Sequence, residues 1–188
     1  MSDRPYSIGV FCGARVGRGS HFAELARLVG ELIASRGWRV VYGGGGIGLM
    51  GHVAEGVLGR GGAVLGIIPQ KLIDLEQAHP RVKQMVVVGT MAERKDIMMR
   101  ESDDFLILPG GIGTLDELFE VLTAFQLHWH GGRAAILNQE GFFDPLIEML
   151  RRMVAEGFWR REAFESLLID ENPTRLLDRL GRRSGVNN

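Results

Sequence analysis

The chain has 188 residues, a length that fits one α/β domain with a sizeable core, and its formal net charge is −1. This near-neutral charge gives no electrostatic reason to expect binding to nucleic acid or to an acidic membrane. The single cysteine, Cys12, excludes an internal disulfide, and no apolar run is long enough for a signal peptide or a membrane span, so we expect a cytoplasmic protein.

Short apolar segments alternate with segments of helical periodicity along the whole chain. The predicted strands are 6–12, 39–42, 63–68, 84–88, 105–108, 134–137 and 164–169. The predicted helices begin after Ser20, near Leu49, at Ala92, at Thr114, at Asp144-Pro145 and at Asn172-Pro173. Continuous apolar strands that alternate with helices predict an α/β fold with a mostly parallel sheet covered on both faces. Residues 1–180 are predicted to form one domain, followed by a flexible tail at 181–188.

Three glycine-rich loops follow predicted strand ends, at 13–19, 43–48 and 110–113. In an open parallel sheet these strand ends share one edge, where ligands bind. Glycines let backbone N–H groups approach a ligand, and the next helix offers its positive N-terminal end. The glycines of any one loop could simply permit a tight turn, but three such loops at one edge favour a phosphate-binding site. We expect the loops at 43–48 and 110–114 to hold the phosphate.

The glycines at 43, 45 and 48 also satisfy G-x-G-x-x-G, a pattern typical of dinucleotide sites. A dinucleotide site needs an acid at the end of the following strand, which here ends "GIIPQ". The motif also follows the second strand rather than the first. NAD(P) is therefore disfavoured, and the absence of G-x-x-x-x-G-K-[ST] gives no support for an ATP P-loop. We predict no cofactor and no metal.

Two further sets of charged residues lie near the glycine loops. Glu117 would fall in the first turn of a helix that begins at Thr114, where compensation of the helix dipole would explain it, although Asp116 could serve equally well. A carboxylate beside a phosphate makes chemical sense if the ligand develops positive charge, as a ribosyl oxocarbenium ion does in N-glycosidic cleavage. Arg94 and Lys95 open a helix on the same edge, where they could balance a phosphate and Glu117.

At these segments the chain resembles a known family. "YGGGGIGLMG", "MAERKDIM" and "LPGGIGTLDELFEVLTAFQL" are similar to the Lonely Guy (LOG) family of nucleotide phosphoribohydrolases, whose hallmark PGGxGTxxE corresponds to residues 109–117. The resemblance runs from Tyr6 to Phe158. It implies a Rossmann-like, doubly wound fold, a homodimer, and hydrolysis of adenosine-type 5′-monophosphates, often cytokinin riboside monophosphates, to free base and ribose 5-phosphate.

The resemblance also implies roles for individual residues. Arg94 and Glu117 match the catalytic pair of the family. Other positions match the nucleotide site, namely Gly44, Gly45, Glu76, Lys95, Gly110, Gly111, Ile112, Gly113 and Thr114. Arg94 could orient the phosphate or the sugar, or help the base to depart.

Two departures from the family pattern bear on the base rather than on the reaction. Ala92 stands where the family usually has His, and Gly13-Ala14-Arg15 stands where it commonly has Gly-Ser-Ser, so both changes remove potential hydrogen-bonding groups. The physiological substrate could be a prenylated nucleotide, AMP or a damaged nucleotide. The alternative from another class is a non-catalytic carrier of a phosphorylated ligand, such as a pterin cofactor. The presence of both Arg94 and Glu117 favours the enzyme.

Overall fold

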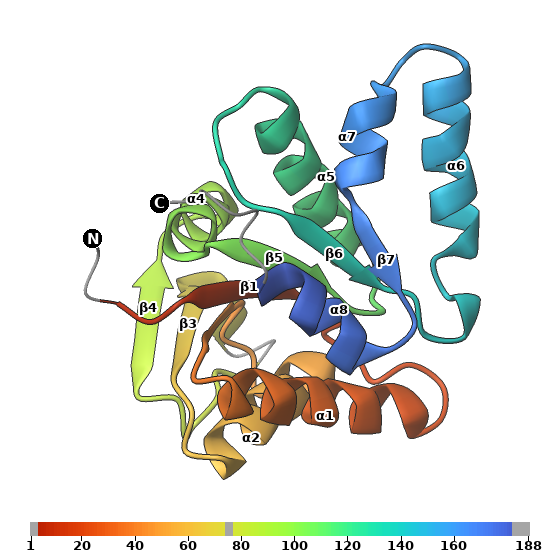
Figure 1. The fold of residues 1–188 in the computed structure, drawn as a ribbon. Coiled ribbons are helices and arrows are strands. Elements are labelled where there is room, and N and C mark those ends of the chain that lie inside the picture. Colours follow the sequence, from red (N-terminus) through yellow and green to blue (C-terminus); the bar gives the residue numbers. More distant parts are fainter. Residues whose placement is uncertain (1–3, 74–76, 182–188) are drawn as a thin grey trace, which may run out of the picture.

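The computed structural model of the protein describes residues 4–73 and 77–181 (Figure 1). Its strands are β1 (Ser7–Phe11), β2 (Arg39–Tyr42), β3 (Val64–Pro69), β4 (Gln84–Val88), β5 (Asp104–Ile107), β6 (Ala134–Leu137) and β7 (Leu168–Asp170). They form one sheet in the order β4-β3-β2-β1-β5-β6-β7, and every pairing is parallel. The predicted parallel α/β architecture is confirmed.

Helices cover both faces of this sheet. They are α1 (His21–Ser35), α2 (Gly48–Gly59), α4 (Met91–Glu101), α5 (Ile112–Gln126), α6 (Asp144–Ala155), α7 (Arg161–Ser166) and α8 (Pro173–Gly181), with short 3₁₀ turns η1 (Gln70–Leu72) and η2 (Gln139–Gly141). α1, α2 and α8 lie on one face, and α4, α5, α6 and α7 lie on the other (Figure 1). The fold is therefore doubly wound, as the resemblance implied. Within the described residues, no helix is both long and apolar enough to cross a membrane.

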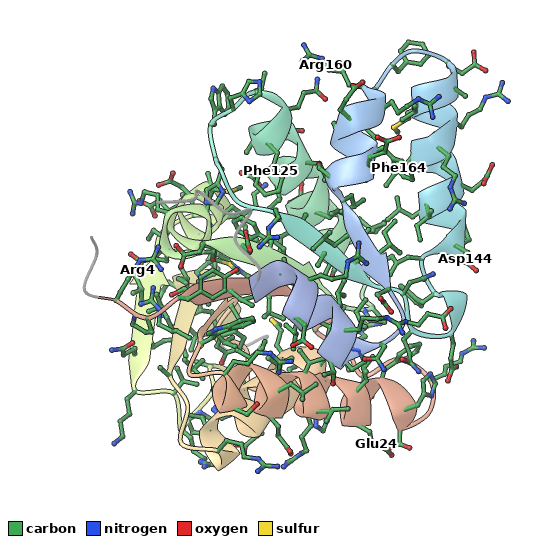
Figure 2. All side chains as sticks on the ribbon, viewed as in Figure 1. Arg4, Glu24, Phe125, Asp144, Arg160 and Phe164 are labelled. Atoms are coloured by element: carbon green, nitrogen blue, oxygen red, sulfur yellow. The ribbon has the colours of Figure 1, made fainter. Side chains whose placement is uncertain are left out.

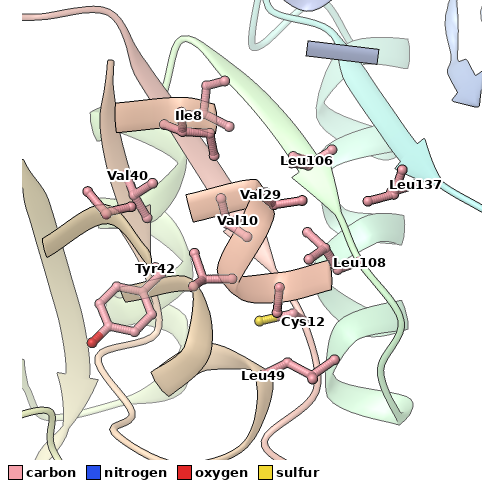
Figure 3. Close-up of a cluster of buried hydrophobic side chains, with 14 of the residues drawn as sticks. Ile8, Val10, Cys12, Val29, Val40, Tyr42, Leu49, Leu106, Leu108 and Leu137 are labelled. Atoms are coloured by element: carbon pink, nitrogen blue, oxygen red, sulfur yellow. The ribbon is translucent and has the colours of Figure 1, made fainter. Parts of the chain in front are cut away.

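The core has two parts because successive strand side chains point to opposite faces. In β1, Val10 belongs to the cluster packed beneath α1 and α2, whereas its neighbour Phe11 belongs to the cluster beneath α4 and α5. Figure 3 shows the first cluster, in which Val10 and Leu106 of adjacent strands lie close to Val29 of α1. Burial on both faces explains why the inner strands β1, β2, β3, β5 and β6 read as continuous apolar runs.

Strand order reverses at β1, which has β2 on one side and β5 on the other. The connections after β1 and after β5 therefore leave the sheet toward opposite faces. A crevice opens between them at the carboxyl edge, where open α/β sheets bind ligands. The fold alone thus directs attention to the loops that follow β1 and β5.

Several local predictions need correction. Residues 161–166 form α7, so the predicted last strand shrinks to β7; Phe164 of this helix packs against Trp159, with ring centroids 6.0 Å apart (Figure 2). α1 begins directly after Ser20, as predicted, although the Ser20 side chain forms no capping hydrogen bond. Gly181, the first residue of the predicted tail, ends α8, and residues 182–188 lie outside the described residues.

The start of α5 also differs from the prediction. Gly111 adopts an extended conformation as its N-cap, and the helix begins at Ile112 rather than at Thr114. Glu117 therefore lies in the second turn, and no acidic residue lies in the first. Because the effect of the helix dipole falls off within the first turn, dipole compensation is a weaker explanation for Glu117 than it was from the sequence.

Candidate functional site

A cavity of about 480 Å³ lies at the carboxyl edge of the sheet, where the strand order reverses. Its lining comes from the loop after β1, from the starts of α2, α4 and α5, and from Phe142, which follows β6. Segments far apart in the sequence meet here because all the strands are parallel and end at the same edge. The cavity therefore occupies the position that the strand topology marks for a ligand.

Arg94 and Glu117 lie together in this cavity. Their side chains are almost fully buried, and Nη2 of Arg94 donates to Oε1 of Glu117 at 3.5 Å. Gly43 makes room for the guanidinium group, since an added Cβ at that position would come within 1.9 Å of Nη2. The structure thus brings the two predicted catalytic residues together from α4 and α5, although their catalytic roles stay a prediction.

The first turn of α4 explains why Arg94 faces inward. Thr90 caps the helix, and its Oγ1 accepts from the Glu93 N–H at 3.1 Å. The Glu93 carboxylate in turn accepts from the N–H groups of Gly89 and Thr90, at 2.7 and 3.2 Å. This reciprocal capping box satisfies N–H groups that the helix itself cannot pair. Glu93 therefore has a structural role, and the next residue, Arg94, is buried against the sheet edge.

The N-terminus of α5 is open to the cavity. Gly110, Gly111, Gly113 and Thr114 all line it. The first N–H of the helix to pair within the chain is that of Leu115, which donates to Gly111 at 3.2 Å. Within the described residues no backbone acceptor is found for the three N–H groups before it, at 112–114. Free N–H groups at the positive end of a helix form a ready site for an anion.

The glycine loop at 43–48 has a different environment, because none of its residues lines the cavity. The Gly44 carbonyl accepts from His79 N–H at 3.0 Å, and Gly46 N–H donates to the Gln77 carbonyl at 2.6 Å. An added Cβ at Gly48 would lie 2.2 Å from the Ala14 carbonyl carbon, so the loop after β1 packs directly on this glycine. Close backbone packing is therefore sufficient to explain Gly46 and Gly48.

Of the remaining predicted ligands, Gly44, Gly45 and Ile112 lie outside the cavity lining. Gly44 and Gly45 belong to the packed loop, where Gly45 forms a bridge with Ala78. The Ile112 side chain is 83% exposed. Glu76 lies outside the described residues. Their assignments as substrate-binding residues stay predictions.

Lys95 points toward α5 rather than into the cavity. Its Nζ lies 2.6 Å from a Glu120 carboxylate oxygen and 3.1 Å from one of Asp116. Hydrogen bonds to Glu120 and Asp116 raise the pKa of Lys95 above its usual value, so the amine stays charged. Lys95 therefore ties α4 to α5 and neutralises Asp116, which itself lines the cavity.

Sequence reasoning missed the apolar part of the site. Val16, Phe22, Met91 and Phe142 line the cavity, and the rings of Phe22 and Phe142 meet edge to face with centroids 5.7 Å apart. Phe22 lies at the start of α1, where helical spacing of apolar residues does not distinguish a ring that faces a cavity from one packed in the core. The position of Phe142 just beyond the β6 strand end was the one available signal. The cavity thus combines an apolar wall, a buried ion pair and an open helix N-terminus.

Comparison with known proteins gives the family. The family model described as "Possible lysine decarboxylase" matches residues 50–180. The chain is 41% identical over 155 residues to the cytokinin riboside 5′-monophosphate phosphoribohydrolase of Rhodococcoides fascians, an alignment that covers 82% of this chain and 78% of that protein. It is 38% identical over 173 residues to the protein of the same name from Mycobacterium marinum, covering 91% and 92% of the two chains. The chain belongs to the LOG family.

The LOG fold also occurs in solved structures of lower identity. The molybdenum cofactor binding protein of Rippkaea orientalis superimposes with a TM-score of 0.72 at 24% identity, covering 94% of this chain and 96% of that one. The molybdenum cofactor carrier protein of Chlamydomonas reinhardtii gives 0.72 at 18% identity, covering 96% and 100%. At these identities the similarity establishes the shared fold alone. The predicted membership of the LOG family and the predicted fold are both confirmed.

Proposed function

We propose that this chain is a phosphoribohydrolase that cleaves the N-glycosidic bond of adenosine-type nucleoside 5′-monophosphates, such as AMP and N6-prenyl-AMP, to free base and ribose 5-phosphate. The names of its LOG-family relatives support this class of reaction. The observation that carries the proposal is the buried Arg94–Glu117 pair, which shares one cavity with the open N-terminus of α5.

The 5′-phosphate would bind at the start of α5. The N–H groups at 112–114 supply donors and the positive end of the helix. Gly110 has to lack a side chain, because an added Cβ would lie 2.1 Å from Oγ1 of Thr114. Binding energy from a phosphate held away from the breaking bond fixes the sugar against the reactive groups, which lowers the barrier as well as the dissociation constant.

Glu117 would act on the anomeric carbon of the ribose. As the bond from C1′ to the base nitrogen breaks, its electron pair leaves with the base and positive charge develops on C1′ and the ring oxygen. A buried carboxylate stabilises that charge and can accept a proton from the attacking water, whose oxygen forms the new bond to C1′. The departing base takes up one proton from solvent, so the overall reaction consumes one water. The hydrogen bond from Arg94 holds the largely buried carboxylate in position.

The apolar wall would hold the base. Phe22 and Phe142 present aromatic surface next to the charged part of the cavity, as a purine requires. Both side chains remain partly exposed, so the wall lies at the mouth of the site. An opening lined by apolar groups accommodates either adenine or an adenine with an apolar N6 substituent.

The cavity fits a phosphoribohydrolase better than it fits a lysine decarboxylase or a non-catalytic carrier of a phosphorylated ligand. A decarboxylase that forms a Schiff base needs a lysine in its site, and no lysine is found among the described residues that line this cavity. Lys95, on the neighbouring helix, is bound by two carboxylates of α5. A carrier of a phosphorylated ligand would need the open helix N-terminus but has no use for the buried Arg94–Glu117 pair.

We also propose that the protein acts as a cytosolic homodimer, as the family resemblance implies. Two apolar side chains near the cavity, Met91 and Ile112, are 43% and 83% exposed and would be covered by a second copy. Light scattering on the purified protein measures the mass in solution, and a 20.8 kDa species at micromolar concentration would contradict the dimer.

The decisive experiment incubates the purified protein with AMP and, separately, with adenosine at equal concentration. Chromatography should show free adenine and ribose 5-phosphate from AMP, and adenosine should be a much poorer substrate because it lacks the phosphate that positions the sugar. Comparable kcat/KM values for the two would mean that the start of α5 serves the fold alone. Absence of adenine from both AMP and N6-prenyl-AMP would refute the proposed reaction.

A further inference from the structure

The charged side chains that line the cavity do not all have partners of opposite charge. Arg94 is paired with Glu117, and Asp116 is paired with Lys95. Among the residues that the structure describes, the remaining charged residue of the lining is Arg15, in the loop after β1. No ion pair or side-chain hydrogen bond of Arg15 is found within residues 4–73 and 77–181. The described part of the lining therefore presents one uncompensated cation to whatever the cavity binds.

The backbone of this loop is held firmly next to the start of α5. Gly13 N–H donates to the Pro109 carbonyl at 3.1 Å, and the Gly13 carbonyl accepts from Leu49 N–H at 2.9 Å. An added Cβ at Gly13 would lie 3.4 Å from Cα of Gly110, so the two loops are in contact. The nitrogen of Arg15 packs in turn on Gly48. These contacts fix the base of the Arg15 side chain close to the helix N-terminus, while the side chain itself is exposed.

The proposed substrate needs such a cation. A nucleoside monophosphate brings close to two negative charges into a site where Glu117 is also negative, whereas a helix N-terminus offers only about half a positive charge. Arg94 cannot offset the phosphate fully, because Glu117 already shares its charge. A guanidinium group matches phosphate geometry through paired N–H donors.

We propose that Arg15 binds the 5′-phosphate together with the start of α5 and so determines the preference for nucleotides over nucleosides; this inference rests on the proposed function. From the sequence, Gly13-Ala14-Arg15 counted as a loss of hydrogen-bonding groups relative to the family pattern. In the structure the same substitution supplies a phosphate ligand from the loop after β1. Arg15 is a substrate-binding residue and takes no part in bond cleavage.

The test compares Arg15→Ala and Arg15→Lys with Arg18→Ala, an exposed arginine of the same loop outside the cavity lining. Steady-state assays with AMP and adenosine are combined with calorimetric titration of ribose 5-phosphate, which carries the phosphate without the base. Arg15→Ala should lower kcat/KM for AMP by about 10- to 100-fold, mostly through KM, as expected for loss of a charge-assisted hydrogen bond. Ribose 5-phosphate should bind more weakly by a similar factor, and adenosine cleavage should be unchanged.

The other variants separate charge from folding. Arg15→Lys should fall between wild type and Arg15→Ala, because it keeps the charge but loses the paired donors, and Arg18→Ala should match wild type. Equal losses for AMP and adenosine in Arg15→Ala, or unchanged kcat/KM for AMP, would overturn the inference while leaving the proposed function intact. If the wild-type protein cleaves no nucleotide, the proposed function fails, and the titration alone then tests whether Arg15 binds phosphate. Weaker binding of ribose 5-phosphate by Arg15→Ala supports this contact, and unchanged binding refutes it.

Discussion

Replacing Gly113 by alanine should make the protein more stable and less active. Gly113 lies in the first turn of α5, and no atom lies within 4 Å of the Cβ that alanine would add. Alanine in a helix is favoured over glycine by up to about 1 kcal/mol, because glycine loses more backbone entropy on folding. Nothing in the folded structure opposes the substitution, so the gain in unfolding free energy should lie between about 0 and 1 kcal/mol at this terminal turn.

Activity should change in the opposite direction. The added methyl group occupies space beside the N–H groups that would hold the phosphate, and Gly113 itself lines the cavity. A displacement of the substrate by about 1 Å can cost on the order of 10² in rate. We therefore expect kcat/KM for AMP to fall roughly 10- to 100-fold in a variant that unfolds at the same or a higher urea concentration.

Gly48→Ala provides the matched control. Gly48 has φ of +61°, and an added Cβ would lie 2.2 Å and 2.3 Å from the Ala14 carbonyl carbon and oxygen. A left-handed conformation alone costs an alanine about 1–2 kcal/mol, and the clash adds to this, so stability should drop by more than about 2 kcal/mol. Urea unfolding followed by circular dichroism measures both variants. If Gly113→Ala retains full activity at unchanged stability, the glycines of α5 do not mark a phosphate site.

Three further predictions concern Glu117 and Arg94 in the cavity and Asp170 at the end of β7. Glu117→Gln keeps the shape but removes the charge, so kcat for AMP should fall on the order of 10²–10³-fold with an unchanged circular dichroism spectrum. Arg94→Ala should lower both kcat and AMP affinity, whereas Arg100→Ala on the same helix should not, because Arg100 forms an exposed pair with Asp96 that is worth less than about 1 kcal/mol. Hydrogen bonds from Arg175 lower the pKa of Asp170 to about 2, below its value in the unfolded chain, so the ionised carboxylate stabilises the fold above about pH 4 and loses this effect as the pH falls. The stability difference between wild type and Asp170→Asn, measured by urea unfolding, should therefore shrink by about half between pH 5 and pH 3.

Each of these predictions has a result that contradicts it. More than half of wild-type turnover in Glu117→Gln would leave that carboxylate a role in folding alone. Equal effects of Arg94→Ala and Arg100→Ala would remove the guanidinium from the site. A stability difference for Asp170→Asn that stays constant from pH 5 to pH 3 would mean that its carboxylate titrates alike in the folded and unfolded chains.

The sequence by itself determined the architecture and the centre of the site. Apolar strands alternating with helices require a parallel sheet covered on both faces, because such strands have no polar side to expose. Parallel strands in turn place every loop that follows a strand at one edge. The run at 109–117 and the start of α4 were therefore expected at the same edge, and the structure places Arg94 and Glu117 within 3.5 Å of each other.

Only the tertiary structure decided which loops and side chains face the cavity. The sequence does not distinguish a glycine that binds a ligand through its N–H group from a glycine that packs against another backbone segment. In the structure, Gly111 borders open space, whereas Gly48 is packed against Ala14. The same applies to charged side chains: Lys95 is paired with two carboxylates of α5, whereas Arg15 lines the cavity with no ion-pair partner among the described residues. These outcomes depend on what lies across the sheet edge, and residues that become neighbours only after the chain has folded have no fixed spacing along it.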